Sequence, residues 1–282
     1  MNKIHEKSFV FTNGKEAFFQ TGKLANRCDS AITVKCGNCV MLITVSTDSK
    51  NTKSTGDTLA LHVDYQEKSY SVAKIPVNNT KRDGKLNEHE ILMSRLIDRC
   101  IRPTIDPNFN STISLNIILL SHDQDIFPEM VACFGASLAL SLSHVPLKCF
   151  FSEVAIYLIN DNWVVNPMAA SVTDPITKIV VGGSDKNIIM LEGVMVEMKK
   201  EKIIEGINIA MEEIKRQCSF QKEFVTSYGD IEKININEQN IEEDKDLTDK
   251  IFTVFQKEIK NKNDLDKELC KIKEQYITHP CK

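Results

Sequence analysis

One apolar run constrains the fold of this 282-residue chain more than any other feature. Residues 113–120 read Ile-Ser-Leu-Asn-Ile-Ile-Leu-Leu, a run too continuous for a half-exposed strand, which indicates burial on both faces. Pro128 then suits the first turn of a helix, and residues 131–142 mix Ala and Gly with larger apolar residues. Small residues let a helix approach a sheet closely, so the two segments predict a buried strand covered by a closely packed helix.

Further strand patterns lie on both sides of this pair. They are expected for residues 8–20, 31–36, 39–45, 59–65, 153–159, 163–165, 178–183 and 187–191. Within this set, Gly182-Gly183 is expected to form a turn, and Trp163 is expected to belong to the core. Apolar residues recur at helical spacing over 203–214. This order of strands and helices predicts an α+β fold of layered sheets and helices.

The length of the chain suits two modules and an appendage. We expect a first part over 1–145 and a second over 146–228. Residues 229–282 are charged and poor in glycine, with amphipathic helical patterns over 251–272 that need a partner to bury against.

Several protein classes are disfavoured by the composition. No run approaches the roughly 18 apolar residues of a membrane span, and the N-terminus lacks a secretory pattern, so we expect a cytoplasmic protein without membrane contact. Nine cysteines in apolar segments favour reduced core thiols. Cys36-Gly-Asn-Cys39 invites a zinc or redox interpretation, but no second CxxC and no paired histidines accompany it, so a hairpin turn is favoured.

A stripe of arginines is the main candidate site. The net charge of -4 limits any nucleic-acid site to a local patch, and residues 74–102 carry a local excess of three positive charges. Arg95, Arg99 and Arg102 are spaced four and then three apart, which places them on one helix face. Guanidinium groups form bidentate contacts with phosphate, so the stripe suits a polyanion.

The same helix permits a second interpretation. Asn87 is expected to cap its start and Pro103 to end it. Acidic residues of this segment could pair with the arginines on a solvated surface, which is common. Asp98, inside the basic stripe, is expected to orient a neighbouring arginine.

Three segments together resemble one known family. Val63–Tyr70, Arg95–Pro103 and Gly135–Ser143 look like bacterial polynucleotide phosphorylase, and the likeness runs through nearly the whole chain in order. It corresponds to the first ribonuclease PH-like repeat and the start of the all-helical segment that follows. The resemblance implies a ribonuclease PH-like fold, a ring-shaped trimer and phosphate-dependent 3'-5' degradation of single-stranded RNA to nucleoside diphosphates, as in mRNA degradation.

The resemblance also implies which residues meet RNA. Arg95 and Arg99 match arginines that face RNA in the family, and Arg102 lies beside them. A channel loop that normally bears two aromatics and two arginines reads Asn-Thr-Lys-Arg over 79–82, so Lys81 and Arg82 preserve the basic pair while the aromatics are absent. Base stacking is worth about 1–3 kcal/mol per base, so we expect this loop to hold RNA mainly through charge.

The family's catalytic carboxylates, Mg²⁺ and phosphate site belong to the second repeat. At the positions matched to the aspartate pair this chain reads Lys186 and Val194, which cannot hold Mg²⁺. We therefore expect no catalytic residue and no metal ligand on this chain, with inorganic phosphate as the co-substrate of the intact enzyme.

Three functional hypotheses remain. The first is the N-terminal portion of a polyribonucleotide nucleotidyltransferase, completed by a downstream continuation or a separate C-terminal half. The second is a non-catalytic RNA-binding or ring-scaffold remnant of that enzyme. The third, a self-sufficient ribonuclease PH-like exonuclease, is disfavoured by Lys186 and Val194.

Overall fold

The computed structural model describes residues 4–48, 59–76, 84, 86–106, 109, 111–172, 177–229, 231 and 233–234. They lie in a compact unit that spans Met1–Ile236, and a second unit spans Asn237–Lys282. The helices expected from the pattern over 251–272 lie outside the described residues.

Six strands form the first sheet, in the order β1-β2-β3-β4-β6-β5. The strands are β1 (His5–Val10), β2 (Glu16–Thr21), β3 (Ser30–Cys36), β4 (Cys39–Thr47), β5 (Leu61–Glu67) and β6 (Ile113–Ser121). All neighbours are antiparallel except β5 and β6, which run parallel. A short 3-10 helix, Ser69–Val72, follows β5.

Strand β6 is the predicted apolar run, and it pairs with a strand on each side. The prediction of burial on both faces is only half right. Ile113, Leu115, Ile117 and Leu119 are fully buried, whereas the alternate residues are half-buried. Strand β6 therefore has a hydrogen-bonded neighbour on each side, while one of its two faces is only partly covered.

The single strand expected over residues 8–20 is wrong, because the structure forms two strands there. A tight turn separates β1 from β2: the Phe11 N–H donates to the Lys15 carbonyl and the Gly14 N–H to the Phe11 carbonyl, both at 2.9 Å, and Gly14 has a φ of 79°. Glycine adopts this positive φ without the steric cost that other residues incur. The apolar alternation continues on both sides of the turn, which hides it in the pattern.

The second sheet has four antiparallel strands in the order β10-β9-β7-β8. They are β7 (Phe151–Ile159), β8 (Asn162–Val165), β9 (Lys178–Ser184) and β10 (Ile188–Val194). The turn expected at Gly182-Gly183 is wrong, since both glycines lie within β9. A Cβ at Gly182 would lie 2.3 Å from Cys100 Sγ, so close approach rather than turn formation explains this glycine.

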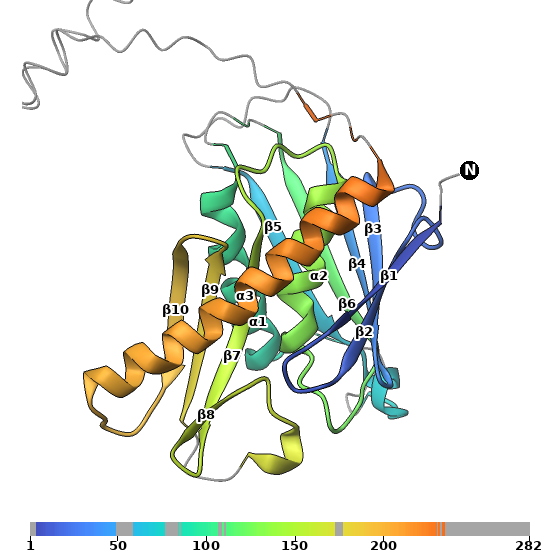
Figure 1. Cartoon of the computed structure of the whole chain (residues 1–282). Helices are drawn as coiled ribbons and strands as arrows, with labels where there is room; N and C mark the ends of the chain where they lie inside the picture. The colour runs from blue at the N-terminus through green and yellow to red at the C-terminus, as the bar shows by residue number, and fades with distance from the viewer. Residues whose placement is uncertain are drawn as a thin grey trace, which may run out of the picture. The chain divides into compact units, whose positions relative to one another are not determined.

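Within the described residues, three α-helices cover the sheets: α1 (Glu88–Ile101), α2 (Glu129–Leu142) and α3 (Lys200–Tyr228). Short 3-10 helices lie at Arg102–Thr104 and Ala169–Ser171. Every residue of α2 is buried, because it packs against β3 and β4 on one side and against β7 and α3 on the other. Figure 1 shows α3 running diagonally across β9, β7 and α2.

The close approach of α2 to the sheet confirms the prediction from its small residues. A Cβ at Gly135 would lie 2.3 Å from Ile43 Cδ1 and 2.8 Å from Val34 Cγ2. Trp163 is 8% exposed and its indole N–H donates to the Lys202 carbonyl at 2.8 Å, which confirms its predicted place in the core. No helix among the described residues is long and apolar enough to span a bilayer.

Candidate nucleic-acid interface

Helix α1 carries the arginine stripe, and a capping box fixes where the helix starts. The Asn87 side chain accepts the Glu90 N–H at 2.8 Å, and Glu90 Oε2 accepts the Asn87 N–H at 2.6 Å. These two bonds pair two of the amides that a helix start leaves without partners. The predicted capping role of Asn87 is confirmed.

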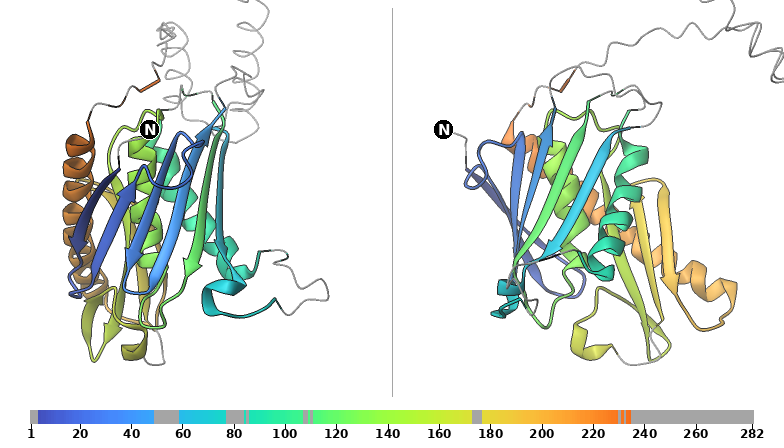
Figure 2. Two further views of the ribbon diagram at one scale, coloured as in Figure 1. Left: turned by 90° about the vertical axis from the view of Figure 1, so that its right-hand side faces the viewer. Right: turned by 180° about the vertical axis from the view of Figure 1, so that it is seen from behind.

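The same first turns of α1 hold the helix against the outer edge of β5. Glu90 Oε1 accepts the Glu67 N–H at 2.7 Å, and Ser94 Oγ accepts the Tyr65 N–H at 3.0 Å. An outermost strand leaves N–H groups that need partners, and here two helix side chains supply them. Figure 2 shows α1 beside β5 at this edge of the sheet.

The structure brings Arg95, Arg99 and Arg102 together on one exposed surface. All three line an open depression of about 710 Å³ between α1 and β5, whose other polar lining residues are His62, Asp64, Ser94, Asp98 and Ser114. The prediction that the three arginines share a face of the helix is confirmed. Lys81 and Arg82 lie outside the described residues.

Two of the three arginines already have acidic partners. Arg102 donates to both carboxylate oxygens of Asp98 at 2.7 and 3.0 Å and to the Leu59 carbonyl at 2.9 Å. The expectation that Asp98 orients an arginine is confirmed. Arg99 Nη1 lies 2.7 Å from Glu192 Oε2 of β10, while Arg95 has no ion-pair partner among the described residues.

These ion pairs leave the arginines available to a stronger anion. The Arg99 and Glu192 side chains are 45% and 52% exposed, and exposed pairs of this kind contribute at most about 1 kcal/mol. A phosphate group can accept the same guanidinium donors in bidentate geometry. The surface can therefore exchange a weak internal partner for a polyanion, although Asp64, Asp98 and Glu192 reduce its positive charge.

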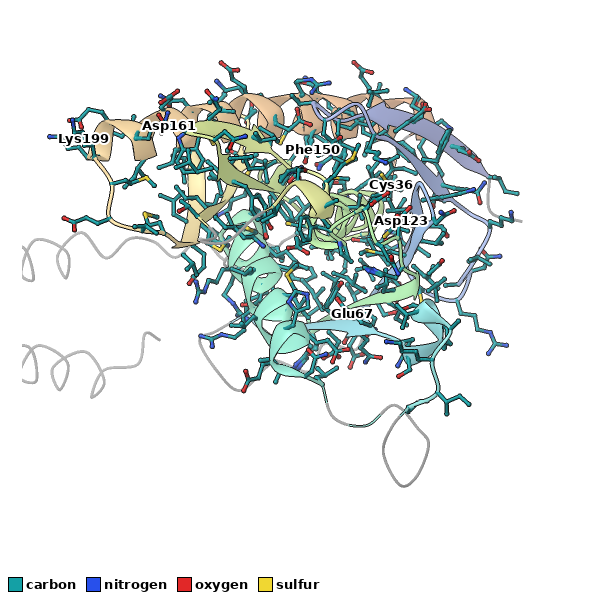
Figure 3. The ribbon with its side chains drawn as sticks, turned by 90° about the horizontal axis from the view of Figure 1, so that it is seen from below. Cys36, Glu67, Asp123, Phe150, Asp161 and Lys199 are labelled. Atoms are coloured by element: carbon teal, nitrogen blue, oxygen red, sulfur yellow. The ribbon has the colours of Figure 1, made fainter. Side chains whose placement is uncertain are left out.

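His89, in the first turn of α1, has a carboxylate partner that the sequence does not reveal. His89 Nε2 lies 3.3 Å from Glu67 Oε1, which also accepts the Tyr65 hydroxyl at 2.8 Å. The hydrogen bond between His89 and Glu67 raises the pKa of the histidine and lowers the pKa of the carboxyl. Figure 3 shows Glu67 near α1, so the pair adds a charge-dependent contact between β5 and the helix start.

The Cys36–Cys39 pair forms a hairpin, as predicted. The two residues face each other across the β3–β4 turn, where the Asn38 N–H donates to Asp123 Oδ2 at 2.9 Å. Figure 3 shows Cys36 beside Asp123. Burial raises the pKa of Cys36 to about 11 and that of Cys39 to about 12, so neither thiol is activated for redox chemistry.

Lys186 and Val194 lie on opposite sides of most of β10. Lys186 lies in the β9–β10 turn, and Val194 is the last residue of the strand and 72% exposed. The strand Ile188–Val194 is by itself about 20 Å long, so these two positions do not share a site.

A different set, Cys100, Cys133 and Glu153, does bring metal-ligating atoms together, within 4.8 Å of one another.

Comparisons with known proteins identify the domain. Residues 13–146 match the 3' exoribonuclease family, domain 1. The polyribonucleotide nucleotidyltransferase of Amoebophilus asiaticus is 38% identical over 284 residues, covering 98% of this chain and 40% of that protein. The Cytophaga hutchinsonii protein of the same name is 37% identical over 230 residues, covering 82% of this chain and 32% of its own length. The chain thus spans about two fifths or less of these relatives.

Solved structures agree on the fold. The rice protein Rrp46 superimposes with a TM-score of 0.58 at 12% identity, covering 80% of this chain and 95% of that chain. A chain of an archaeal exosome core gives a TM-score of 0.55 at 14% identity, covering 79% and 86%. Together with the family match over residues 13–146, these likenesses confirm the predicted α+β, ribonuclease PH-like fold.

Proposed function

Residues 13–146 belong to the 3' exoribonuclease family, and on that basis we propose that the chain is the N-terminal portion of a phosphorolytic 3'-5' exoribonuclease. The intact enzyme converts RNA and inorganic phosphate to shortened RNA and nucleoside diphosphates, as in mRNA degradation. The similarity to the first two fifths of polyribonucleotide nucleotidyltransferases supports this assignment.

The role of this portion is to contact single-stranded RNA and to build the ring. One observation carries the RNA role: Arg95, Arg99 and Arg102 converge on one open depression, on a helix tied to the sheet by Glu90 and Ser94. Phosphoryl transfer depends strongly on positioning, and arginines that hold the RNA backbone serve that purpose. Lys81 and Arg82 are proposed to extend the contact along the RNA.

Chemistry is assigned to residues outside this chain. The positions that the resemblance matches to the catalytic aspartates hold Lys186 and Val194, which offer no carboxylate for Mg²⁺ and lie too far apart to share one ion. Mg²⁺ would be bound by the second repeat, which would also bind phosphate. We propose a cytoplasmic assembly that completes the enzyme, either a homotrimeric ring or a complex with a separate C-terminal half.

RNA binding tests the assignment of the arginines. Labelled oligo(A) is titrated at several salt concentrations, and the logarithm of the binding constant is plotted against the logarithm of the salt concentration. The slope of this plot should become less steep when Arg95 and Arg99 are both replaced by Ala. Each lost phosphate contact reduces the slope by about 0.7 on single strands, so the double variant should lose about 1.4. Lys23→Ala with Arg27→Ala, from the exposed β2–β3 loop, removes the same charge and should leave the slope near that of wild type.

If the slope is unchanged in the Arg95 and Arg99 variant, the arginine stripe is a solvated helix surface and does not bind RNA.

The catalytic assignment has its own test, in which purified chain receives oligo(A), phosphate and Mg²⁺. Release of ADP by this chain alone would refute the assignment of chemistry to a second repeat and favour a self-sufficient exonuclease. ADP release only after addition of the second repeat supports the proposal, whereas RNA binding without reconstitution favours a scaffold remnant.

A further inference from the structure

Three potential metal ligands meet in the core, each from a different element. Cys100 lies near the end of α1, Cys133 in the second turn of α2 and Glu153 near the start of β7. The two thiols are fully buried and the Glu153 side chain is 3% exposed. Their ligand atoms all lie within 4.8 Å of one another, and Cys100 Sγ lies 3.7 Å from Glu153 Oε2.

The environment of Glu153 is unusual for a buried carboxyl group. Buried carboxylates normally pair with a cation or with several N–H donors. Here the nearby lysine, Lys178, is bound to Glu129 at 2.7 Å, and within the described residues the side-chain partners of Glu153 are the two thiols. Thiols are weak donors, so the carboxyl is poorly compensated as it stands.

Two thiolates and a carboxylate are ligands that zinc accepts in tetrahedral sites. The carboxylate distinguishes zinc from Cu(I), because a hard oxygen ligand does not suit a soft monovalent ion. A disulfide between Cys100 and Cys133 is disfavoured because the two thiols are buried and their pKa values are raised. Such thiols react slowly with oxidants.

We propose that Cys100, Cys133 and Glu153 bind one structural Zn²⁺ in the core of this chain. The two sulfurs and one carboxylate oxygen of Glu153 provide three donor atoms, and a water molecule enclosed with the ion would complete the tetrahedron. Binding replaces the protons of the two thiols and of the carboxyl group, and these three protons leave to solvent. The ion then gives the carboxylate a cationic partner, and the loaded site of two thiolates, one carboxylate and Zn²⁺ carries a net charge of −1.

The surroundings of the cluster allow little adjustment of its ligands. Cys100 Sγ sits directly over Gly182 of β9, where a Cβ would lie at 2.3 Å. Because the site is enclosed, Zn²⁺ enters while the chain folds rather than by diffusion into the native core. The bound ion would tie α1, and therefore the arginine stripe, to both α2 and β7.

Refolding the full chain with and without Zn²⁺ tests the proposal. After desalting, protein refolded with Zn²⁺ should retain one zinc per chain by mass spectrometry and should unfold at a higher temperature. Refolding with Co²⁺ should give a thiolate-to-cobalt charge-transfer band in the near ultraviolet, a readout that needs no variant. Protein that retains no stoichiometric metal and shows no such band would overturn the proposal and leave a cluster of neutral hydrogen-bonded groups.

Variants locate the ion. Cys100→Ser with Cys133→Ser should abolish the charge-transfer band, and Glu153→Gln should shift it while leaving the two sulfur ligands. The matched control is Cys36→Ser with Cys39→Ser, which removes a second closely spaced thiol pair and should preserve the band. Loss of the band in the control alone would place the metal at the hairpin and refute the assignment to the core.

Discussion

Replacing Glu153 by Gln tests whether the core holds a neutral carboxylic acid when no metal is bound. Glu153 is buried on β7, and the groups that face it are Cys100 of α1, Cys133 and Glu129 of α2, and Lys178 of β9. Glutamine has nearly the same shape and stays uncharged at every pH. The substitution therefore removes the titration of this group while preserving most of its packing.

Burial is the largest cause of the shift, and it raises the pKa of Glu153 from 4.5 to about 7. One pKa unit corresponds to about 1.4 kcal/mol, so the whole difference amounts to about 3 kcal/mol. Because the folded-state pKa is raised, this stabilising contribution is fully present below pH 4.5. It is lost as the pH rises through 7, where folding would have to bury a charge.

The assay is urea unfolding of wild type and Glu153→Gln from pH 4.5 to pH 8 with a chelator present, followed by the fluorescence of the single tryptophan, Trp163. The stability difference between the two proteins should change by about 3 kcal/mol across this range, with wild type losing more. Other titrating groups cancel in the difference. If the stability difference between the two proteins stays constant with pH, Glu153 is not a neutral buried acid. The argument that its carboxyl group lacks adequate partners then fails as well.

Three further substitutions probe the site and its support. Glu192→Gln removes the acidic partner of Arg99 and should tighten oligo(A) binding about twofold to fivefold, the equivalent of a weak exposed ion pair; weaker binding would mean that Glu192 positions the arginine instead. Gly135→Ala places a methyl group against Ile43 and should destabilise the fold by about 1–3 kcal/mol in urea unfolding, and a neutral result would contradict the close packing of α2. Asn87→Ala should lower the free energy of unfolding by about 1 kcal/mol in the same assay, and an unchanged stability would mean that the Glu90 bonds alone hold the helix start.

Local features of the fold were predictable because short-range chemistry determines them. Asn87 was identified as a cap from its place before an acidic helix turn, and the Cys36–Cys39 hairpin from the Gly-Asn pair between two apolar strands. The small residues of α2 indicated a close approach, and Gly135 makes it. Each of these predictions depends on residues within a few positions of one another.

The features that sequence reasoning missed depend on contacts between distant segments. Arg99 meets Glu192, 93 residues away, and Cys100 meets Glu153, 53 residues away. Neither pair has a characteristic spacing, since the layering of α1 against the second sheet creates both contacts. Gly182 was misread for the same reason, because the thiol that requires a glycine there comes from another element.

Helix α1 connects the proposed binding surface to the core through consecutive residues. Arg99 is exposed beside the depression, and the next residue, Cys100, is fully buried against Glu153. A rigid helix transmits any displacement of Cys100 to the guanidinium groups on its opposite face. The start of the same helix is held where Glu90 and Ser94 accept N–H groups of β5, so Arg95 and Arg99 lie between two fixed points and Arg102 follows the second. An arginine positions a phosphate only as well as its helix is held, and α1 is held at its start by hydrogen bonds to a strand edge and near its end by core packing around Cys100.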